Sequence, residues 1–347
     1  YWIAEAGLAD EPPLDSLGAD AGADVVIVGG GYTGMWAAWS IKAREPDAEV
    51  VVLEADRCGF GPSGRNGGFV NSMWFSLPTM RAMFSDAEAL EVARLAGESV
   101  RQIGAFCEEQ EVDAWYRAGG YLQASTAPHF DDTWAGIVSS CRELGADDAI
   151  TELDRDGIAA RCASPLFRAA AFYPDAATVQ PARLAAGLRD RLLAAGVTIR
   201  ERTPVSSVTE RGGEVEVATT GGKVRAKACV LAAGSSLLRF RPLRRALTAT
   251  SPHMVIPEPV PGLFDELGVR GGGCITPPGS RAPRCRRGGA PLRAAPSRGA
   301  RRAPRWPTPR GGRDGCRGGL PDPRPRGAAR GAAGGRRRRG GGGRARR

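Results

Sequence analysis

The pattern of apolar residues predicts an α/β fold whose first regular elements lie between residues 24 and 54. Residues 25–28 form a β-branched run, which is typical of a strand buried on both faces. Residues 33–44 carry apolar side chains near one face of a helix, and Pro46 should end that helix. Residues 50–53 are a second apolar run, so the segment predicts a strand, a helix and a second strand.

The chain up to residue 245 continues to alternate between helical and strand patterns. Helices are predicted over residues 86–110 and 130–144, and from Pro181 to a stop at Gly196. We expect the aromatic residues of the second helix, including Trp134, to pack in the core and not against a cofactor. Strands are predicted over residues 121–124, 197–200, 205–209, 214–218, 223–227 and 229–233, with a hairpin turn at residues 219–222.

Glycines separate the first predicted strand from the first predicted helix. Gly29, Gly31 and Gly34 have the spacing G-x-G-x-x-G, with Tyr32 and Thr33 at the start of the helix. The first glycine permits a tight turn, the second lets the backbone approach a pyrophosphate, and the third lets helix and strand pack closely. The N–H groups of the helix N-terminus then face the phosphates. The alternative is a glycine-rich turn in an ordinary α/β domain.

Two features after the second strand strengthen the dinucleotide interpretation. Glu54 follows Gly34 by twenty residues, where a carboxylate accepts hydrogen bonds from a ribose diol and disfavours a 2′-phosphate. A second glycine-dense segment covers residues 57–68. Glycine lets the backbone run extended beside a large flat ligand, with Ser63, Arg65 and Asn66 as its polar side chains. We therefore expect an adenine dinucleotide other than NADP; an ordinary loop is the alternative for this segment.

Composition limits the partners that the chain can have. The 347 residues allow about two domains, and no apolar run approaches the roughly 18 residues of a membrane span. The net charge is +10, but residues 277–347 contain 22 Arg and 2 Asp without Lys or Glu. The remaining body is therefore acidic, with a net charge of −10. The basic charge gives no reason to expect that the body binds nucleic acid or a membrane.

The eight cysteines and two histidines predict neither a metal site nor a disulfide framework. No C-x-x-C pair occurs, and His129 and His253 are too few for a zinc site. Scattered cysteines are typical of reduced thiols in a cytoplasmic protein, and we expect Cys141 and Cys229 to pack in the interior. The chain begins at Tyr1 without a Met, so we expect its true start to lie upstream, and residues 1–23 should form a leader lying over the surface.

Five short segments together are more specific than the glycine spacing alone. They are Val-Ile-Val-Gly-Gly-Gly-Tyr-Thr-Gly at 26–34, Val-Leu-Glu-Ala-Asp-Arg-Cys-Gly at 52–59, Ser-Gly-Arg-Asn-Gly-Gly at 63–68, Ala-Ala-Thr-Val-Gln-Pro-Ala-Arg-Leu at 176–184 and Val-Leu-Ala-Ala-Gly at 230–234. Over residues 20–275 the chain resembles the D-amino-acid-oxidase-like FAD-dependent oxidoreductases. Within that family it is most similar to the γ-glutamylputrescine-oxidase-like and glycine-oxidase-like branch.

The resemblance implies FAD as the cofactor and assigns a part of it to each segment. The first glycine segment would face the pyrophosphate, Glu54 the adenosine ribose, the segment 63–68 the flavin, and the backbone of Val205 the adenine. Ala233 and Gly234 would close the nucleotide cleft. The implied cofactor-binding residues are Gly29, Gly31, Tyr32, Thr33, Gly34, Glu54, Ala55, Arg57, Ser63, Arg65, Asn66, Gly67, Gly68, Val205, Ala233 and Gly234.

The resemblance also implies an architecture and a reaction. A Rossmann-like FAD-binding domain (24–80 and 176–245) would carry an inserted α+β substrate domain with a mixed sheet (81–175 and 246–276). Its relatives oxidise a C–N bond of an amine or amino acid: a hydride equivalent passes to the flavin, the imine hydrolyses, and O₂ becomes H₂O₂. No catalytic acid or base is assigned, and His253 should be structural. No oligomeric state is predicted.

The segment 277–347 departs from this family pattern. Arg, Gly, Ala and Pro make up 61 of its 71 residues, and their codons can consist of G and C alone. We predict a disordered tail that arises from a frameshift near Thr276–Pro277, with loss of the substrate-binding groups. The alternatives are a genuine Arg/Gly-rich tail that binds nucleic acid and, least favoured, a structured extension. The whole chain would then be either a compromised oxidase or a remnant without enzymatic activity.

Overall fold

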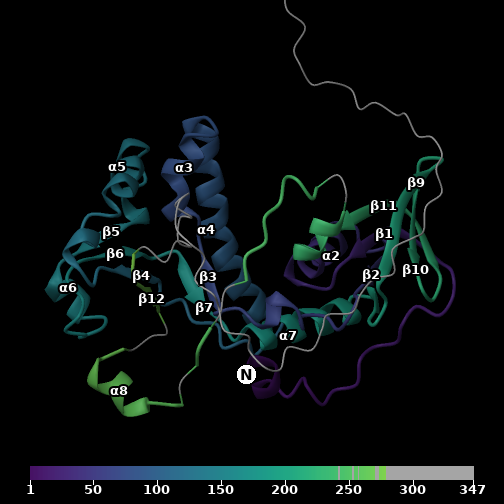
Figure 1. Ribbon diagram of the computed structural model, residues 1–347, viewed down its shortest axis with the longest axis horizontal. Coiled ribbons are helices and arrows are strands. Elements are labelled where there is room, and N and C mark those ends of the chain that lie inside the picture. Colours follow the sequence, from purple (N-terminus) through teal and green to yellow (C-terminus); the bar gives the residue numbers. More distant parts are fainter. Residues whose placement is uncertain (241–242, 252–253, 257, 270–272, 279–347) are drawn as a thin grey trace, which may run out of the picture. The chain divides into compact units, whose positions relative to one another are not determined.

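A computed structural model describes residues 1–240, 243–251, 254–256, 258–269 and 273–278, all within one compact unit, Tyr1–Arg284. The unit contains a six-stranded, a four-stranded and a two-stranded sheet (Figure 1). The tail that was predicted to be disordered lies outside the described residues from residue 279 onward, as does His253. The frameshift and the domain boundaries stay predictions.

The six-stranded sheet has the order β8-β2-β1-β11-β10-β9. Its strands are β1 (Ala21–Val28), β2 (Val50–Leu53), β8 (Thr198–Arg200), β9 (Val205–Arg211), β10 (Glu214–Thr219) and β11 (Lys223–Leu231). The first four in the order run parallel to one another, and β10 pairs antiparallel with both β11 and β9. All four residues of β2 are buried, as expected for a strand with both faces covered.

One strand prediction was wrong in its bounds. Residues 223–227 and 229–233 were predicted as two separate strands, but a single strand, β11, runs from Lys223 to Leu231, and residues 232–233 lie beyond its end. This strand pairs with the hairpin partner β10 on one side and with β1 on the other. Because β1 supplies backbone hydrogen-bonding groups along the whole length of β11, Ala228 continues the ladder and does not break it.

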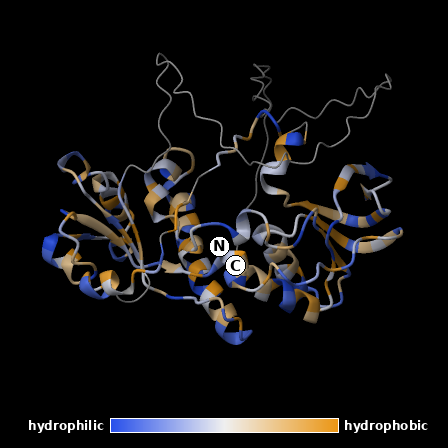
Figure 2. Cartoon of the chain, turned by 60° about the horizontal axis from the view of Figure 1, so that its bottom comes forward, coloured by the Kyte–Doolittle hydropathy of each residue, from blue (hydrophilic) through white to orange (hydrophobic). Residues whose placement is uncertain are grey.

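Two helices cover the six-stranded sheet and contribute much of the core. They are α2 (Tyr32–Arg44) and α7 (Pro181–Ala194), and the chain between β1 and β2 passes through α2. Ile27, Met35 and Leu188 are fully buried between these elements. In Figure 2, hydrophobic and hydrophilic residues alternate along the helices, as expected for helices that pack one side against a core.

The four-stranded sheet is mixed; three of its strands come between β2 and β8 in the sequence, and the fourth follows β11. Its order is β12-β4-β6-β5, with β12 parallel to β4 and the other pairs antiparallel. The strands are β4 (Tyr121–Ala124), β5 (Thr151–Leu153), β6 (Ala170–Tyr173) and β12 (Cys274–Thr276). This arrangement confirms the predicted fold class, a Rossmann-like sheet with an inserted α+β part.

Helices pack on the four-stranded sheet through a compact aromatic core. Trp74, Trp134 and Tyr173 are buried in this core, as expected for Trp134, and Cys141 packs beside them. The helix predicted over residues 130–144 is shorter than expected, because Pro128–Phe130 forms a separate 3₁₀ turn before α5. The helices here are α3 (Leu77–Arg81), α4 (Asp86–Glu109), α5 (Ala135–Glu143) and α6 (Arg155–Ala159).

The remaining elements are short. The strands β3 (Phe69–Asn71) and β7 (Ala176–Thr178) form the two-stranded sheet, and α1 (Trp2–Glu5) and α8 (Pro261–Glu266) are single helices. The 3₁₀ turns are η1 (Pro62–Gly64), η2 (Trp74–Ser76), η3 (Pro128–Phe130), η4 (Asp147–Ala149) and η5 (Gly234–Arg239). Among the described residues, no helix combines the length and the apolar character that a membrane crossing requires.

Two adjacent leucines of α7 test the packing of this core. Leu192 is fully buried, whereas Leu193 is 38% exposed. We expect Leu192→Ala to lower the free energy of unfolding by about 2–5 kcal/mol, because it leaves a cavity. Leu193→Ala should change it by about 0.5 kcal/mol or less. Urea unfolding followed by circular dichroism measures both, and equal losses would contradict this orientation of α7.

Candidate cofactor site

The carboxyl ends of three parallel strands bring the predicted nucleotide-binding segments together. The N–H of Gly29, after β1, donates to the carbonyl of Leu53 at 2.9 Å. The N–H of Ala232, after β11, donates to the carbonyl of Val28 at 2.8 Å. The segments that begin at residues 29, 54 and 232 therefore meet at one edge of the sheet, which is where α/β sheets bind their ligands.

The glycine turn cannot accept side chains at its first and third glycines. Gly29 has φ +114°, and a Cβ there would lie 2.5 Å from the carbonyl oxygen of Ala232. A Cβ on Gly34 would lie 1.9 Å from the carbonyl oxygen of Gly29. At Gly31 the one described neighbour within 4 Å of such a Cβ is Ser63 Oγ, at 3.0 Å. Neighbouring backbone therefore fills the space next to Gly29 and Gly34, whereas space remains next to Gly31.

Glu54 supports the turn from the neighbouring strand. One carboxylate oxygen accepts the N–H of Gly30 at 2.7 Å, and the other accepts the N–H of Asp56 at 2.9 Å. Glu54 is half-buried, so its carboxylate also borders solvent. The side chain predicted to bind ribose thus lies beside the glycine turn and holds it in place.

The glycine-rich segment, residues 57–68, contacts the start of α2. Ser63 Oγ accepts the N–H of Tyr32 at 2.9 Å, so one of the helix N–H groups expected to face phosphate is paired inside the protein. The Asn66 side chain donates to the carbonyl of Ser63 at 2.7 Å and accepts the N–H of Gly68 at 2.8 Å. Asn66 therefore holds the shape of the segment.

Arg57 carries buried donor groups without a partner. Its Nε and Nη2 atoms are inaccessible to solvent and make no hydrogen bond with any described residue. The guanidinium lies over the ring of Phe60, 4.0 Å from the ring centroid. Buried donors in folded proteins nearly always have a partner, so Arg57 has the chemistry to donate to an acidic or polar ligand.

The other predicted site residues lie around this edge of the sheet. Val205 and Ala233 pack in one cluster with Val28 and Leu53. Val205 also follows Thr203, whose N–H donates to the carbonyl of Glu54 at 2.8 Å. The exposed members of the predicted set are Thr33, Ala55, Arg65, Gly67 and Gly234.

Burial removes two nearby groups from consideration as acids or bases. Burial raises the pKa of the Tyr32 hydroxyl, which donates to the carbonyl of Pro181 at 2.7 Å. Burial and the neighbouring Glu201 raise the pKa of the Cys58 thiol well above its ordinary value. Both groups stay neutral near pH 7. Among the described residues, no group of three or more His, Cys, Asp or Glu side chains could hold a metal ion.

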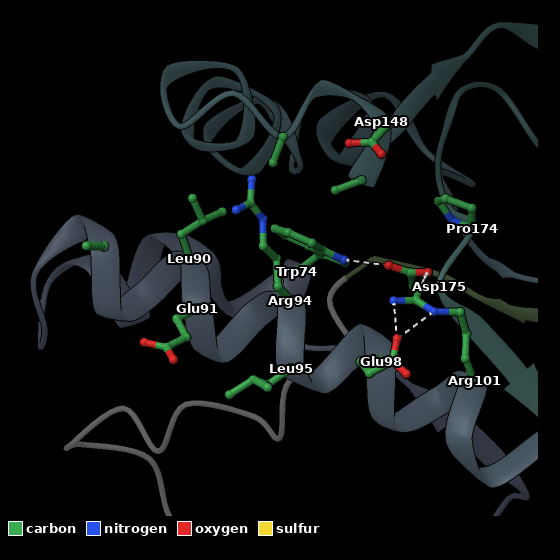
Figure 3. Close-up of a pocket in the computed structure, with 13 residues that line it drawn as sticks. Trp74, Leu90, Glu91, Arg94, Leu95, Glu98, Arg101, Asp148, Pro174 and Asp175 are labelled. Atoms are coloured by element: carbon green, nitrogen blue, oxygen red, sulfur yellow. Dashed lines mark hydrogen bonds and ion pairs between the residues drawn. The ribbon is translucent and has the colours of Figure 1, made fainter.

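A separate cavity of about 760 Å³ lies beside α4 and is lined by none of the predicted site residues. Figure 3 shows Asp175 between Trp74 and Arg101 in this cavity. Asp175 accepts from Trp74 Nε1 at 3.2 Å and from Arg101 at 2.7 Å. These three side chains satisfy one another, and no residue that lines the cavity is among the described residues with buried, unpaired side-chain atoms, in contrast to Arg57.

Sequence reasoning missed Glu201, a fully buried carboxylate that follows β8. Its two oxygens accept the N–H groups of Leu14 and Cys58, both at 2.8 Å. A signal was present, because Glu201 follows its strand as Glu54 follows β2. The sequence analysis assigned ligand contacts only to Glu54, the acidic residue that follows Gly34 by twenty residues.

The comparison with protein families identifies the family and the cofactor. A model of the FAD dependent oxidoreductases, the DAO family, matches residues 24–302. The chain belongs to this family. The predicted resemblance and the prediction of FAD are thereby confirmed. The matched range extends past the predicted break at Thr276–Pro277, and the origin of the segment beyond that point stays a prediction.

Curated relatives of this DAO-family chain are oxidoreductases. γ-Glutamylputrescine oxidoreductase of Escherichia coli (strain K12) is 31% identical over 237 residues, which cover 65% of this chain and 52% of that protein. The probable oxidoreductase OrdL of Rhizobium meliloti (strain 1021) is 25% identical over 267 residues, covering 74% and 62%. The chain therefore spans roughly half to three fifths of the length of these relatives.

Solved structures share the fold of this DAO-family chain. Glycine oxidase from Geobacillus kaustophilus superposes with a TM-score of 0.54 at 23% identity, covering 66% of this chain and 59% of that one. L-Amino acid deaminase from Proteus myxofaciens superposes with a TM-score of 0.51 at 23% identity, covering 65% and 47%. At these identities the likeness supports the fold and not a particular substrate.

The contact between α2 and β1 can be tested at Gly34. Gly34→Ala should lower the free energy of unfolding by at least about 1–3 kcal/mol, because the methyl group would collide with the backbone of Gly29. Gly136→Ala is the matched control in the first turn of α5, where a Cβ meets no described atom within 4 Å. It should be neutral or stabilising by up to about 1 kcal/mol. A Gly34→Ala chain as stable as this control would refute the close contact.

Proposed function

We propose that the chain binds FAD at the carboxyl edge of its six-stranded sheet. The observation that carries the proposal is the family match over residues 24–302, which includes the glycine turn, Glu54 and the glycine-rich segment. The proposed ligand residues are the sixteen inferred from the sequence. The open side of Gly31 would admit the pyrophosphate, and Glu54 would accept from the ribose in exchange for one of its backbone partners.

The proposed site orients and encloses the cofactor through backbone and polar groups. The buried Nε and Nη2 donors of Arg57 would pair with polar atoms of the adenosine diphosphate part. The glycine-rich segment would run beside the flavin ring, where its lack of side chains leaves room. When bound, the flavin supplies the electron acceptor for oxidation of a C–N bond. We assign no proton-transfer residue.

We further propose an amine or amino acid as the substrate and O₂ as the electron acceptor. The names of the relatives support this class: γ-glutamylputrescine oxidoreductase and glycine oxidase act on compounds that contain an amino group. We place the protein in the cytoplasm, because all six described cysteines are free and a reducing compartment keeps thiols in that state.

Absorption spectroscopy of the purified chain tests the proposal. We expect flavin absorption in the visible range, and anaerobic bleaching on addition of γ-glutamylputrescine, glycine or another amine. Readmission of air should restore the absorption and yield H₂O₂. Bound flavin that no amine bleaches would favour the non-enzymatic alternative. A chain that binds no flavin after incubation with excess FAD would refute the cofactor site itself.

Arg57 provides a test that separates cofactor binding from folding. We expect Arg57→Met to weaken FAD binding about tenfold or more, because charged hydrogen bonds to the cofactor are lost. The same variant without FAD should unfold at the same or a higher urea concentration, since it no longer buries unpaired donors. Arg44→Met, at the exposed far end of α2, is the control for charge.

The two measurements are flavin fluorescence titration and urea unfolding. A variant at Arg57 that loses stability without FAD and keeps its FAD affinity would show that the guanidinium supports the fold instead.

A further inference from the structure

Residues 1–20, here called the N-terminal strap, run along the body and are held by specific contacts. The strap begins with α1, drawn in purple beside α7 in Figure 1. Glu5 pairs with Arg183 of α7 at 3.1 Å, and Glu11 pairs with Arg189 at 3.0 Å. Leu8 and Leu17 are both buried, with 6% of each residue exposed. Charged pairs and apolar side chains therefore both attach the strap.

One direct hydrogen bond and one bridging carboxylate connect the strap to the glycine-rich segment. The indole Nε1–H of Trp2 donates to the carbonyl oxygen of Asn66 at 3.0 Å. Asn66 is the residue whose side chain closes this segment through hydrogen bonds to Ser63 and Gly68. The start of the strap thus reaches the segment that would pass along the flavin.

Glu201 makes the second connection from a fully buried position. One carboxylate oxygen accepts the N–H of Leu14 in the strap, and the other accepts the N–H of Cys58 in the glycine-rich segment. A buried carboxylate is stable only when its hydrogen bonds are made. Detachment of the strap would leave one oxygen without its protein partner and admit water next to the other. The strap and the glycine-rich segment therefore share one buried charge.

Thr203 adds a link to the segment that carries Glu54. Its hydroxyl oxygen accepts the N–H of Leu17 in the strap at 3.0 Å, while its own N–H donates to the carbonyl of Glu54 at 2.8 Å. Through Glu201 and Thr203 the strap is therefore linked both to the glycine-rich segment and to Glu54. The Glu11–Arg189 pair joins the strap to α7.

We propose that the N-terminal strap holds the glycine-rich segment in the arrangement that binds FAD, and that Glu201 is the positioning residue through which it acts. This inference rests on the proposed FAD site. Because coupling between two binding events is reciprocal, bound FAD should also tighten the strap. The affinity for FAD then depends on the strap as well as on the residues that contact FAD.

Three single substitutions in the full chain test the coupling. Trp2→Phe removes the indole N–H and keeps an aromatic ring at this position. Glu201→Gln keeps the shape of the side chain but turns an NH₂ group toward one of two N–H donors. Asp10→Asn is the control, because this exposed side chain of the strap makes no hydrogen bond or ion pair with any described residue. Amide hydrogen exchange over residues 57–68, measured without flavin, and the dissociation constant for FAD are the two readouts.

We expect exchange of the Cys58 N–H and its neighbours to accelerate about tenfold in Trp2→Phe and Glu201→Gln, with FAD affinity reduced by a similar factor. Asp10→Asn should leave both values unchanged. In the unmodified chain, FAD should slow cleavage of the strap by a glutamate-specific protease. If Glu201→Gln does not fold, the hydrogen exchange and FAD affinity of Trp2→Phe alone test the proposal.

The outcomes separate the two proposals. Exchange over residues 57–68 that is the same in Trp2→Phe as in the unmodified chain would overturn the strap proposal, whether or not flavin binds. Faster exchange with an unchanged FAD affinity would overturn it as well, because the segment would then not need the strap to hold FAD. An unmodified chain that binds no FAD would instead refute the proposed function, and with it the role of the strap in retention.

Discussion

The approach of the α2 backbone to the end of β1 is the constraint on which the candidate site depends. The position that a Cβ of Gly34 would occupy lies 1.9 Å from the carbonyl oxygen of Gly29, so the helix comes this close to the strand only without a side chain. This contact sets the N-terminus of α2 at the carboxyl edge of the sheet. Glu54 and Ser63 then make hydrogen bonds to the backbone of the same turn.

Two glutamates at the ends of neighbouring parallel strands show how burial separates roles. Glu54 follows β2 and Glu201 follows β8, and both accept backbone N–H groups. Glu54 is half-buried, so solvent or a ligand can replace one of its partners. Glu201 is fully buried, and loss of a partner there leaves a charge in a medium that solvates it poorly. The first arrangement suits ligand binding, and the second suits the fixing of backbone segments.

Local patterns predicted those elements whose conformation the local sequence decides. The strand over residues 50–53 and the helix that begins at Pro181 have the predicted bounds to within a residue, because apolar runs, proline and glycine act over a few positions. The division at Ala228 was wrong because pairing with β1 extends β11 through it. At Asn66, the structure shows side-chain hydrogen bonds within its own segment, which the local pattern did not predict.

The sequence by itself determined the α/β class, the glycine turn, the acidic residue after β2 and the kind of cofactor, because each depends on residues close together in the chain. Only the tertiary structure decided what joins these parts. Glu201 accepts from residues 187 and 143 positions away, and Trp2 donates to Asn66 across 64 positions. Such partners leave no periodic pattern in the sequence, since folding alone brings them within hydrogen-bonding distance. The unpaired donors of Arg57 likewise became visible only once its neighbours were in place.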